Sequence, residues 1–127
     1  MGSITGLDHV QLAAPPGCED DARRFFGDLL GLEELEKAPL LAVRGGCWFR
    51  VGAHELHIGV ADPFVPAGKA HPALRLATEA DLQELAARLE AADVPVTWAD
   101  PAEIPGVERF HAADPWGNRL EFVAQRT

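Results

Sequence analysis

The stretch FHAADPWGNRLEFVA, residues 110–124, predicts two strands joined by a tight turn. Asp114-Pro115 favours the start of the turn, because Asp bonds to nearby backbone and Pro restricts its own φ angle. Gly117-Asn118 closes the turn with two residue types that adopt positive φ at little cost. In the second strand Glu121 lies between two apolar residues. Taken alone, this pattern is typical of an exposed acid on a half-buried strand.

The first half of the chain predicts one strand, one helix and three further strands. Apolar and polar residues alternate over 4–14, which predicts a strand, and apolar residues recur at helical spacing over 19–30. Three short strands with glycine-containing turns between them are predicted over 32–37, 47–51 and 55–61.

The second half predicts the same order of elements. Residues 71–77 predict a strand, and Thr78 begins a helix to about residue 92, with Asp81 placed as in a capping box. Three strands are predicted over 94–98, 107–112 and 119–124. Because one order of elements occurs twice, the sequence predicts an α+β fold of two tandem βαβββ modules, 1–62 and 70–127, joined by a connector over 63–69.

The composition limits the classes of function. The 127 residues suffice for one compact domain or two small modules that share a core. There is no run of 18 apolar residues and no signal peptide, so we expect no membrane span. The net charge of −9 argues against a nucleic-acid partner and suits a neutral or cationic small ligand. The two cysteines lack the spacing of a disulfide framework or zinc knuckle, which fits a cytoplasmic protein.

The repeat places four potential metal ligands at equivalent positions. Aligned by their first strands, the halves match His9 with His71 at an offset of 62, and aligned by their last strands they match His57 with Glu121 at an offset of 64. Equivalent positions converge on the axis of a pseudo-twofold structure. The repeat therefore predicts that these four side chains meet at one site.

Three imidazoles and a carboxylate suit one divalent transition metal ion, such as Zn²⁺, Fe²⁺, Ni²⁺, Co²⁺ or Mn²⁺. Each histidine also has an ordinary interpretation: His9 as half of a surface pair with the preceding aspartate, His57 as a hydrogen-bonded strand residue, and His71 as a loop residue. The coincidence of all four at repeat-equivalent positions favours the metal site.

Two further residues are candidates for acid–base catalysis. Glu55 shares a strand face with His57, so it is either a general base or a surface acid on an edge strand. His111 is either a proton-transfer group, for which an imidazole pKa is suitable, or an ordinary exposed histidine. Glu121 could also transfer protons if it left the metal.

Four other residues are candidates for contact with a substrate. Gln11 shares a strand face with His9. Trp48 and Arg50 alternate along one strand and could form a wall of the site. Arg109 lies on the same face as His111 or faces solvent.

Five stretches together resemble the vicinal-oxygen-chelate superfamily: LDHVQLAA, RRFFGDLLGL, ELHIGV, HPALRLATEADLQELAARLEAADVPV and FHAADPWGNRLEFV. This superfamily includes glyoxalase I, fosfomycin-resistance enzymes, methylmalonyl-CoA epimerase, extradiol dioxygenases and bleomycin-resistance proteins. The resemblance implies a cupped mixed sheet around one metal, with His9, His71 and Glu121 as ligands. His57 stands where bacterial glyoxalase I has a fourth ligand, a glutamate, and His111 where the thiol transferases line their pocket.

The resemblance implies a metal-dependent enzyme that acts as a Lewis acid on a small substrate with vicinal oxygens, as a lyase, isomerase, thiol transferase or epoxide-opening enzyme. One alternative is a metal-free drug-binding protein of the bleomycin-resistance type, and another is an extradiol-type dioxygenase. The resemblance also implies a homodimer, in which each site combines the first module of one chain with the second module of the other.

Overall fold

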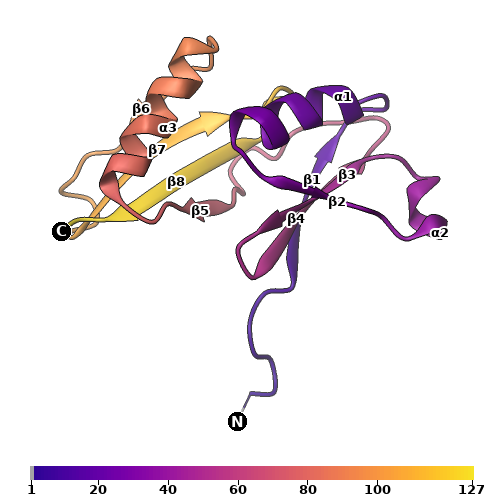
Figure 1. Cartoon of the computed structure of the whole chain (residues 1–127), viewed down its shortest axis with the longest axis horizontal. Coiled ribbons are helices and arrows are strands. Elements are labelled where there is room, and N and C mark those ends of the chain that lie inside the picture. The colour runs from indigo at the N-terminus through magenta and orange to yellow at the C-terminus, as the bar shows by residue number, and fades with distance from the viewer. Residues whose placement is uncertain (1) are drawn as a thin grey trace. The chain divides into compact units, whose positions relative to one another are not determined.

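The computed structural model describes residues 2–127. The chain forms two compact units, the first ending at Pro66 and the second comprising Ala67–Thr127. The boundary lies inside the connector predicted over 63–69. Each unit contains one four-stranded mixed sheet (Figure 1). In the part of the chain from residue 2 onward, no helix is long and apolar enough to cross a membrane.

The sheet of the first unit has the strand order β1-β4-β3-β2, in which β1 is parallel to β4 and the other neighbours are antiparallel. A short helix, α2, was not predicted; it starts at a proline, which suits the first turn of a helix. The elements of this unit are β1 (His9–Ala14), α1 (Glu19–Ala22), the π-helix η1 (Arg23–Leu29), β2 (Glu33–Leu35), α2 (Pro39–Ala42), β3 (Cys47–Val51) and β4 (His54–Val60).

The prediction of a strand over 4–14 is wrong for residues 4–8. β1 pairs only with β4, and this pairing begins where His9 lies opposite Glu55. Before His9, the carbonyl oxygen of Asp8 accepts a hydrogen bond of 3.2 Å from the backbone N–H of Glu55, but residues 2–7 pair with no strand among the residues described, and the side chains of Ile4 and Leu7 are exposed. A polar–apolar alternation therefore forms a strand only where a partner strand is present.

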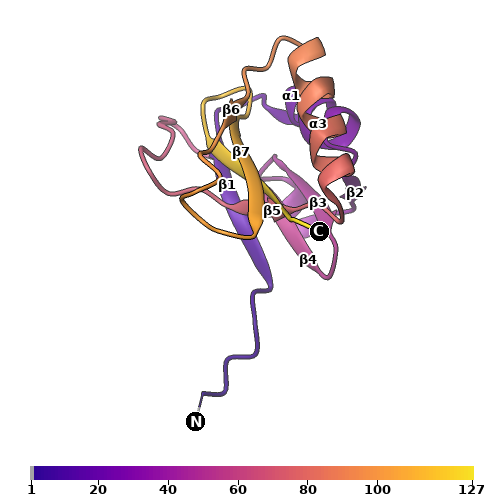
Figure 2. The ribbon, with the colours of Figure 1, turned by 90° about the vertical axis from the view of Figure 1, so that its left-hand side faces the viewer.

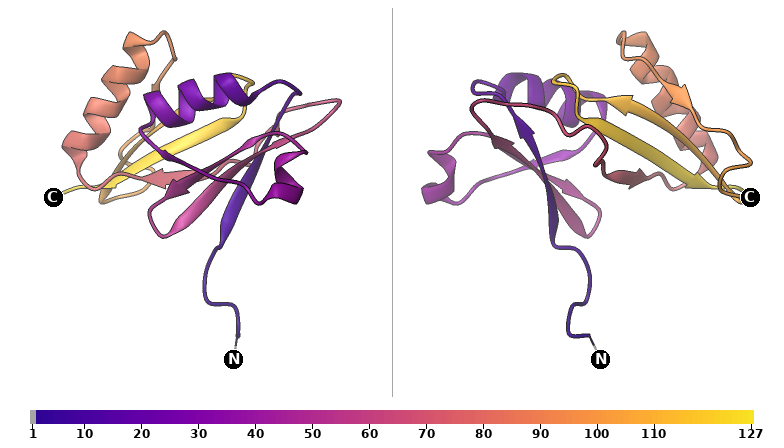
Figure 3. Two further views of the ribbon diagram at one scale, coloured as in Figure 1. Left: turned by 45° about the vertical axis from the view of Figure 1, so that its right-hand side comes forward. Right: turned by 180° about the vertical axis from the view of Figure 1, so that it is seen from behind.

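One face of each sheet forms the core of its unit. In the first unit Phe26 of η1 packs against Phe49 of β3, and Leu56 and Ile58 of β4 are buried on the same side. Each such side chain stabilises the fold by about 1.5–3 kcal/mol. The helix predicted over 19–30 is formed by α1 and η1, which cover this face and end at Leu29; Gly31 follows with a φ of 75° (Figure 3).

Both cysteines belong to this core. Cys18 and Cys47 are free thiols, and burial raises the pKa of each to about 11. Both thiols therefore remain protonated at neutral pH and have little nucleophilic character.

The second unit has the strand order β5-β8-β7-β6, again with the first strand parallel to its neighbour. Its long helix, α3, is capped by Thr78, whose Oγ1 accepts a hydrogen bond of 3.0 Å from the backbone N–H of Asp81, as the capping box predicts. Helix α3 lies along one face of the sheet (Figures 1 and 2). The elements are β5 (Ala73–Arg75), α3 (Glu79–Ala91), β6 (Thr97–Trp98), β7 (Val107–Ala113) and β8 (Arg119–Gln125).

The turn between β7 and β8 is held by a buried carboxylate. Oδ1 of Asp114 accepts hydrogen bonds from the backbone N–H groups of Trp116 and Asn118, at 3.0 and 2.8 Å, and Oδ2 accepts one of 2.7 Å from the Asn118 side chain. Burial raises the pKa of Asp114 despite these hydrogen bonds. The turn sets the register of the hairpin, in which Glu121 lies opposite His111.

The two sheets place equivalent residues at equivalent positions. In the first unit His57 of β4 lies opposite Trp48 of β3, and in the second Glu121 of β8 lies opposite His111 of β7. All four belong to the sheet face opposite the helices, because the core residues alternate with them along each strand. Trp48 and His111 are therefore counterparts in the repeat.

Candidate metal centre

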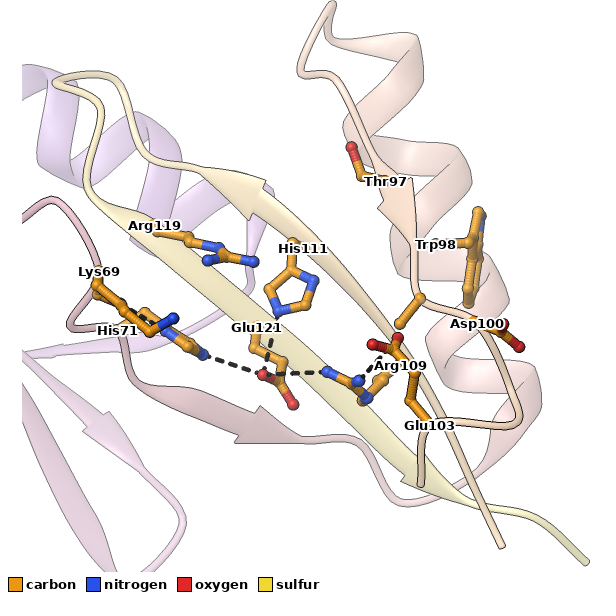
Figure 4. Close-up of a pocket in the computed structure, with 11 residues that line it drawn as sticks. Lys69, His71, Thr97, Trp98, Asp100, Glu103, Arg109, His111, Arg119 and Glu121 are labelled. Atoms are coloured by element: carbon orange, nitrogen blue, oxygen red, sulfur yellow. Dashed lines mark hydrogen bonds and ion pairs between the residues drawn. The ribbon is translucent and has the colours of Figure 1, made fainter. Parts of the chain in front are cut away.

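Two histidines and a glutamate converge on the open face of the second sheet. His111 projects from β7, Glu121 from β8, and His71 from the residues just before β5 (Figure 4). Oε1 of Glu121 lies 3.0 Å from Nε2 of His71 and 3.2 Å from Nε2 of His111. The three potential ligand atoms all lie within 4.8 Å of one another. Neighbouring ligands at metal distances of about 2.1 Å are separated by about 3.0 Å in an octahedral site, so this arrangement fits one ion.

The tautomer of His71 supports the same interpretation. Its Nδ1 lies 2.9 Å from the backbone carbonyl oxygen of Lys69, which can only accept a hydrogen bond. The proton of a neutral His71 is therefore on Nδ1, and Nε2 presents a lone pair to a carboxylate oxygen. Two lone pairs at 3.0 Å repel unless a proton or a metal ion lies between them. Metal-bound histidines typically use this kind of second hydrogen bond to a carbonyl oxygen.

The surroundings of Glu121 favour the ionised form of its carboxylate. Burial opposes ionisation of Glu121, but its contact with His71, the charge of Arg109 and its contact with His111 together outweigh burial, so the pKa of the Glu121 carboxyl lies below its ordinary value. Nη1 of Arg109 is 3.6 Å from Oε1 of Glu121, and its Nη2 is 3.2 Å from Glu103. Arg109 thus faces the site on the same side as His111, one of the two alternatives that the sequence left open.

In the first unit the other two predicted ligands form a stack. The rings of His9 and His57 are parallel to within 15°, with centroids 4.1 Å apart. Trp48 stacks on the other side of His57, with centroids 4.3 Å apart. The structure therefore joins the four predicted ligands as two pairs, His9 with His57 in the first unit and His71 with Glu121 in the second.

The remaining candidates of the first unit lie around this stack. Glu55 accepts a hydrogen bond of 2.9 Å from Nε2 of His57. The Gln11 amide lies over Gly59, where an added Cβ would be only 2.7 Å from it. Arg50 lies opposite Glu55 on the neighbouring strand and forms an ion pair of 3.1 Å with Glu33. A cavity of about 590 Å³ is lined by Gln11, Trp48, Glu55 and both histidines, but not by Arg50.

The sequence did not predict two basic residues that lie beside the histidine–glutamate cluster of the second unit. Lys69 and Arg119 line the same cavity of about 420 Å³ as the histidine–glutamate cluster. They lie on the side of the cluster away from Arg109 (Figure 4). Strand parity could have identified Arg119, which is two residues before Glu121 on β8 and so shares its face. No local pattern indicates Lys69, which precedes β5 in a loop.

Together the repeated βαβββ order and a histidine–glutamate cluster on an open sheet face define a class of small α+β proteins with a potential metal centre. The chain belongs to the Glyoxalase/Bleomycin resistance protein/Dioxygenase superfamily, whose family model matches residues 6–122. The predicted fold of two tandem modules with a glyoxalase-like arrangement is confirmed.

Solved structures agree with this assignment. A Bacillus anthracis protein assigned to the glyoxalase family is 44% identical, with a TM-score of 0.91 and coverage of 99% of both chains. Lactoylglutathione lyase from Agrobacterium tumefaciens is 23% identical, with a TM-score of 0.73 and coverage of 97% of this chain and 96% of that one. The fosfomycin resistance protein FosX from Listeria monocytogenes is 18% identical, with a TM-score of 0.74 and coverage of 97% and 95%. The last two show a shared fold. Comparison with curated proteins gives no match.

Proposed function

We propose that the protein is a metal-dependent enzyme of this superfamily that acts on a small substrate with two vicinal oxygens. The observation that carries the proposal is the cluster of His71, His111 and Glu121, whose ligand atoms lie within 4.8 Å of one another. A bound divalent ion would act as a Lewis acid toward the substrate oxygens. The protein side chains would hold the ion, orient the substrate and move protons.

In this proposal His71, His111 and Glu121 of the second unit are ligands. His9 is kept as a ligand from the predicted homodimer, in which the first module of one chain meets the second module of the other. His9 is included because it is the repeat equivalent of His71, and because its Nδ1 lies 2.9 Å from Asp8, which leaves Nε2 for an ion. Glu55 is the proposed proton acceptor, since it is only partly exposed and its Oε1 already lies 2.9 Å from an imidazole nitrogen.

The proposed substrate is an anion. Of the 11 lysines and arginines in an otherwise acidic chain, Lys69, Arg109 and Arg119 line the cavity of the cluster. Arg109 is paired with Glu103 and Glu121, whereas the side chains of Lys69 and Arg119 form no ion pair with any residue from 2 to 127. Two such cations beside a potential metal centre suit a carboxylate or phosphate group. This local charge favours an anionic substrate over the neutral or cationic ligand that the net charge of the chain suggests.

The function is tested by metal binding. Protein purified without a metal-affinity tag is stripped with a chelator and titrated with Mn²⁺, Ni²⁺, Zn²⁺ and anaerobic Fe²⁺. We expect about one ion per chain, and at least about tenfold weaker binding in His71→Ala and His111→Ala. If His111 moves protons instead, as the sequence predicts, His111→Ala will lower turnover and leave metal affinity unchanged. Absence of binding to all four metals would contradict the proposal and favour a metal-free binding protein.

The anionic group is tested with inorganic phosphate. Phosphate is titrated into the metal-free protein and followed by NMR chemical shifts of the second unit. Arg119→Gln and Lys69→Gln are each expected to weaken binding by about tenfold, the loss of one charge-assisted hydrogen bond. Arg126→Gln, a charge change on the exposed side chain after β8, is the matched control. Equal phosphate affinity in all four proteins would rule out this anion site.

A further inference from the structure

His57 lies in the middle of a stack of three rings. Trp48 and His9 lie on its two faces, with interplanar angles of 11° and 15°. The strand register accounts for this arrangement, because Trp48 is directly opposite His57 on β3 and His9 is on the neighbouring strand β1. His57 is only 7% exposed. The ammonium of Lys37 lies over the ring of Trp48, 5.7 Å from the ring centroid.

The hydrogen bonds distinguish the two histidines. Nδ1 of His9 lies 2.9 Å from the carboxylate of Asp8, so a neutral His9 carries its proton on Nδ1 and has a lone pair on Nε2. Nε2 of His57, in contrast, is already 2.9 Å from Oε1 of Glu55. The stack thus presents one nitrogen that is free for an ion and one that is already bonded to a carboxylate.

Ring geometry prevents both histidines from binding the same ion. The lone pair of an imidazole nitrogen lies in the plane of its ring, so two nearly parallel rings direct their lone pairs along nearly parallel planes. With ring centroids 4.1 Å apart, these directions do not converge on a point about 2.1 Å from both nitrogens. His57 could become a ligand beside His9 only if the stack were broken.

We propose that His57 is a positioning residue and that Trp48 and His57 together fix the ring of His9, whose Nε2 is the ligand. This inference rests on the proposed function, since it assigns His9 to the metal. It replaces the ligand role that the sequence predicted for His57. What position 57 contributes is an aromatic face, and Trp48 stacks on the other side of that ring.

The test distinguishes the stacking contribution of the His57 ring from a contribution of its nitrogen atoms as metal ligands. His57→Phe keeps an aromatic ring without a ligand atom, and His57→Ala removes both. We expect metal affinity, measured by isothermal titration calorimetry, to stay within about threefold of wild type in His57→Phe and to fall by about tenfold or more in His57→Ala. Trp48→Phe and Trp48→Ala repeat the comparison from the other side of the stack with the same expected order. Urea unfolding identifies any variant that fails to fold.

A second measurement does not depend on metal. In the metal-free protein, NMR of the His9 ring is expected to report the same single Nδ1–H tautomer and ring-current shift in wild type and His57→Phe, and averaged signals in His57→Ala. The positioning role is overturned if His57→Phe loses metal as severely as His57→Ala, which would indicate a ligand. It is also overturned if the His9 signals are unchanged in His57→Ala. If wild type binds no metal, the proposed function fails, and the NMR result still decides whether the stack orders His9.

Discussion

Glu121→Gln is expected to weaken metal binding by at least about 100-fold, more than the loss of a residue that only supports a ligand. The substitution removes the only anionic ligand of the proposed set, while the amide keeps the size and shape of the side chain. The remaining donors are neutral imidazoles beside Arg109, whose guanidinium lies 3.6 Å from Oε1 of Glu121 and would repel an incoming cation once the carboxylate is neutralised. The measurement is the dissociation constant for Mn²⁺ and Zn²⁺ by calorimetry, together with the metal content of the purified protein.

Glu108→Gln is the matched control for this experiment. Glu108 is on β7, directly beside the strand of Glu121, but its carboxylate accepts a hydrogen bond of 2.7 Å from Gln83 of α3 on the opposite face of the sheet. The control should bind metal like wild type. If Glu121→Gln also binds within about threefold of wild type, the carboxylate is not a ligand and the cluster is a hydrogen-bonded network only.

Gly46→Ala is expected to destabilise the protein by about 3–5 kcal/mol, the sum of backbone strain and overpacking. Gly46 has a φ of 83°, and a Cβ at this position would be 2.1 Å from the carbonyl oxygen of Ile58. Its N–H also donates a hydrogen bond of 2.7 Å to Glu19. Because small domains have only about 5–15 kcal/mol of stability, urea unfolding should show a large shift in midpoint.

Gly52→Ala is the control that separates backbone strain at positive φ from steric overlap of the added Cβ. Gly52 also has a positive φ, 57°, but nothing lies within 4 Å of the position of its Cβ. Its substitution should cost only about 1–2 kcal/mol, the price of a left-handed conformation for a residue with a side chain. Equal losses in the two variants would show that the close approach of Gly46 to β4 contributes nothing.

Much of the fold could be predicted because it depends on local patterns. The order of strands and helices followed from alternation and helical spacing, and the capping of α3 by Thr78 followed from a short motif. The β7–β8 turn followed from residues whose backbone preferences are strong. The strand prediction is wrong for residues 4–8 because a strand also needs a partner strand. The partner of β1 is β4, more than 40 residues later in the chain, and its pairing with β1 begins only at His9.

The candidate site was less predictable, because its chemistry depends on side-chain orientation. The sequence could place His57 on the correct face, but stacking between Trp48 and His9 follows from the register of three strands. The tautomer of His71 follows from one carbonyl oxygen two residues before it. Arg119 shares a face with Glu121, but the sequence alone does not single it out, because a lone arginine on a strand is common on protein surfaces.

The equivalence of Trp48 and His111 has a consequence for how such a protein acquires new chemistry. Both occupy equivalent positions of a duplicated sheet, yet one half offers a flat aromatic surface where the other offers an imidazole nitrogen. In a fold built from two copies of one module, one module can keep the residues of the candidate metal centre during evolution. The other module can change residues at equivalent positions and so adapt to a different substrate. Exchanging residues between equivalent positions of the two modules is therefore a direct way to redesign the chemistry of either module.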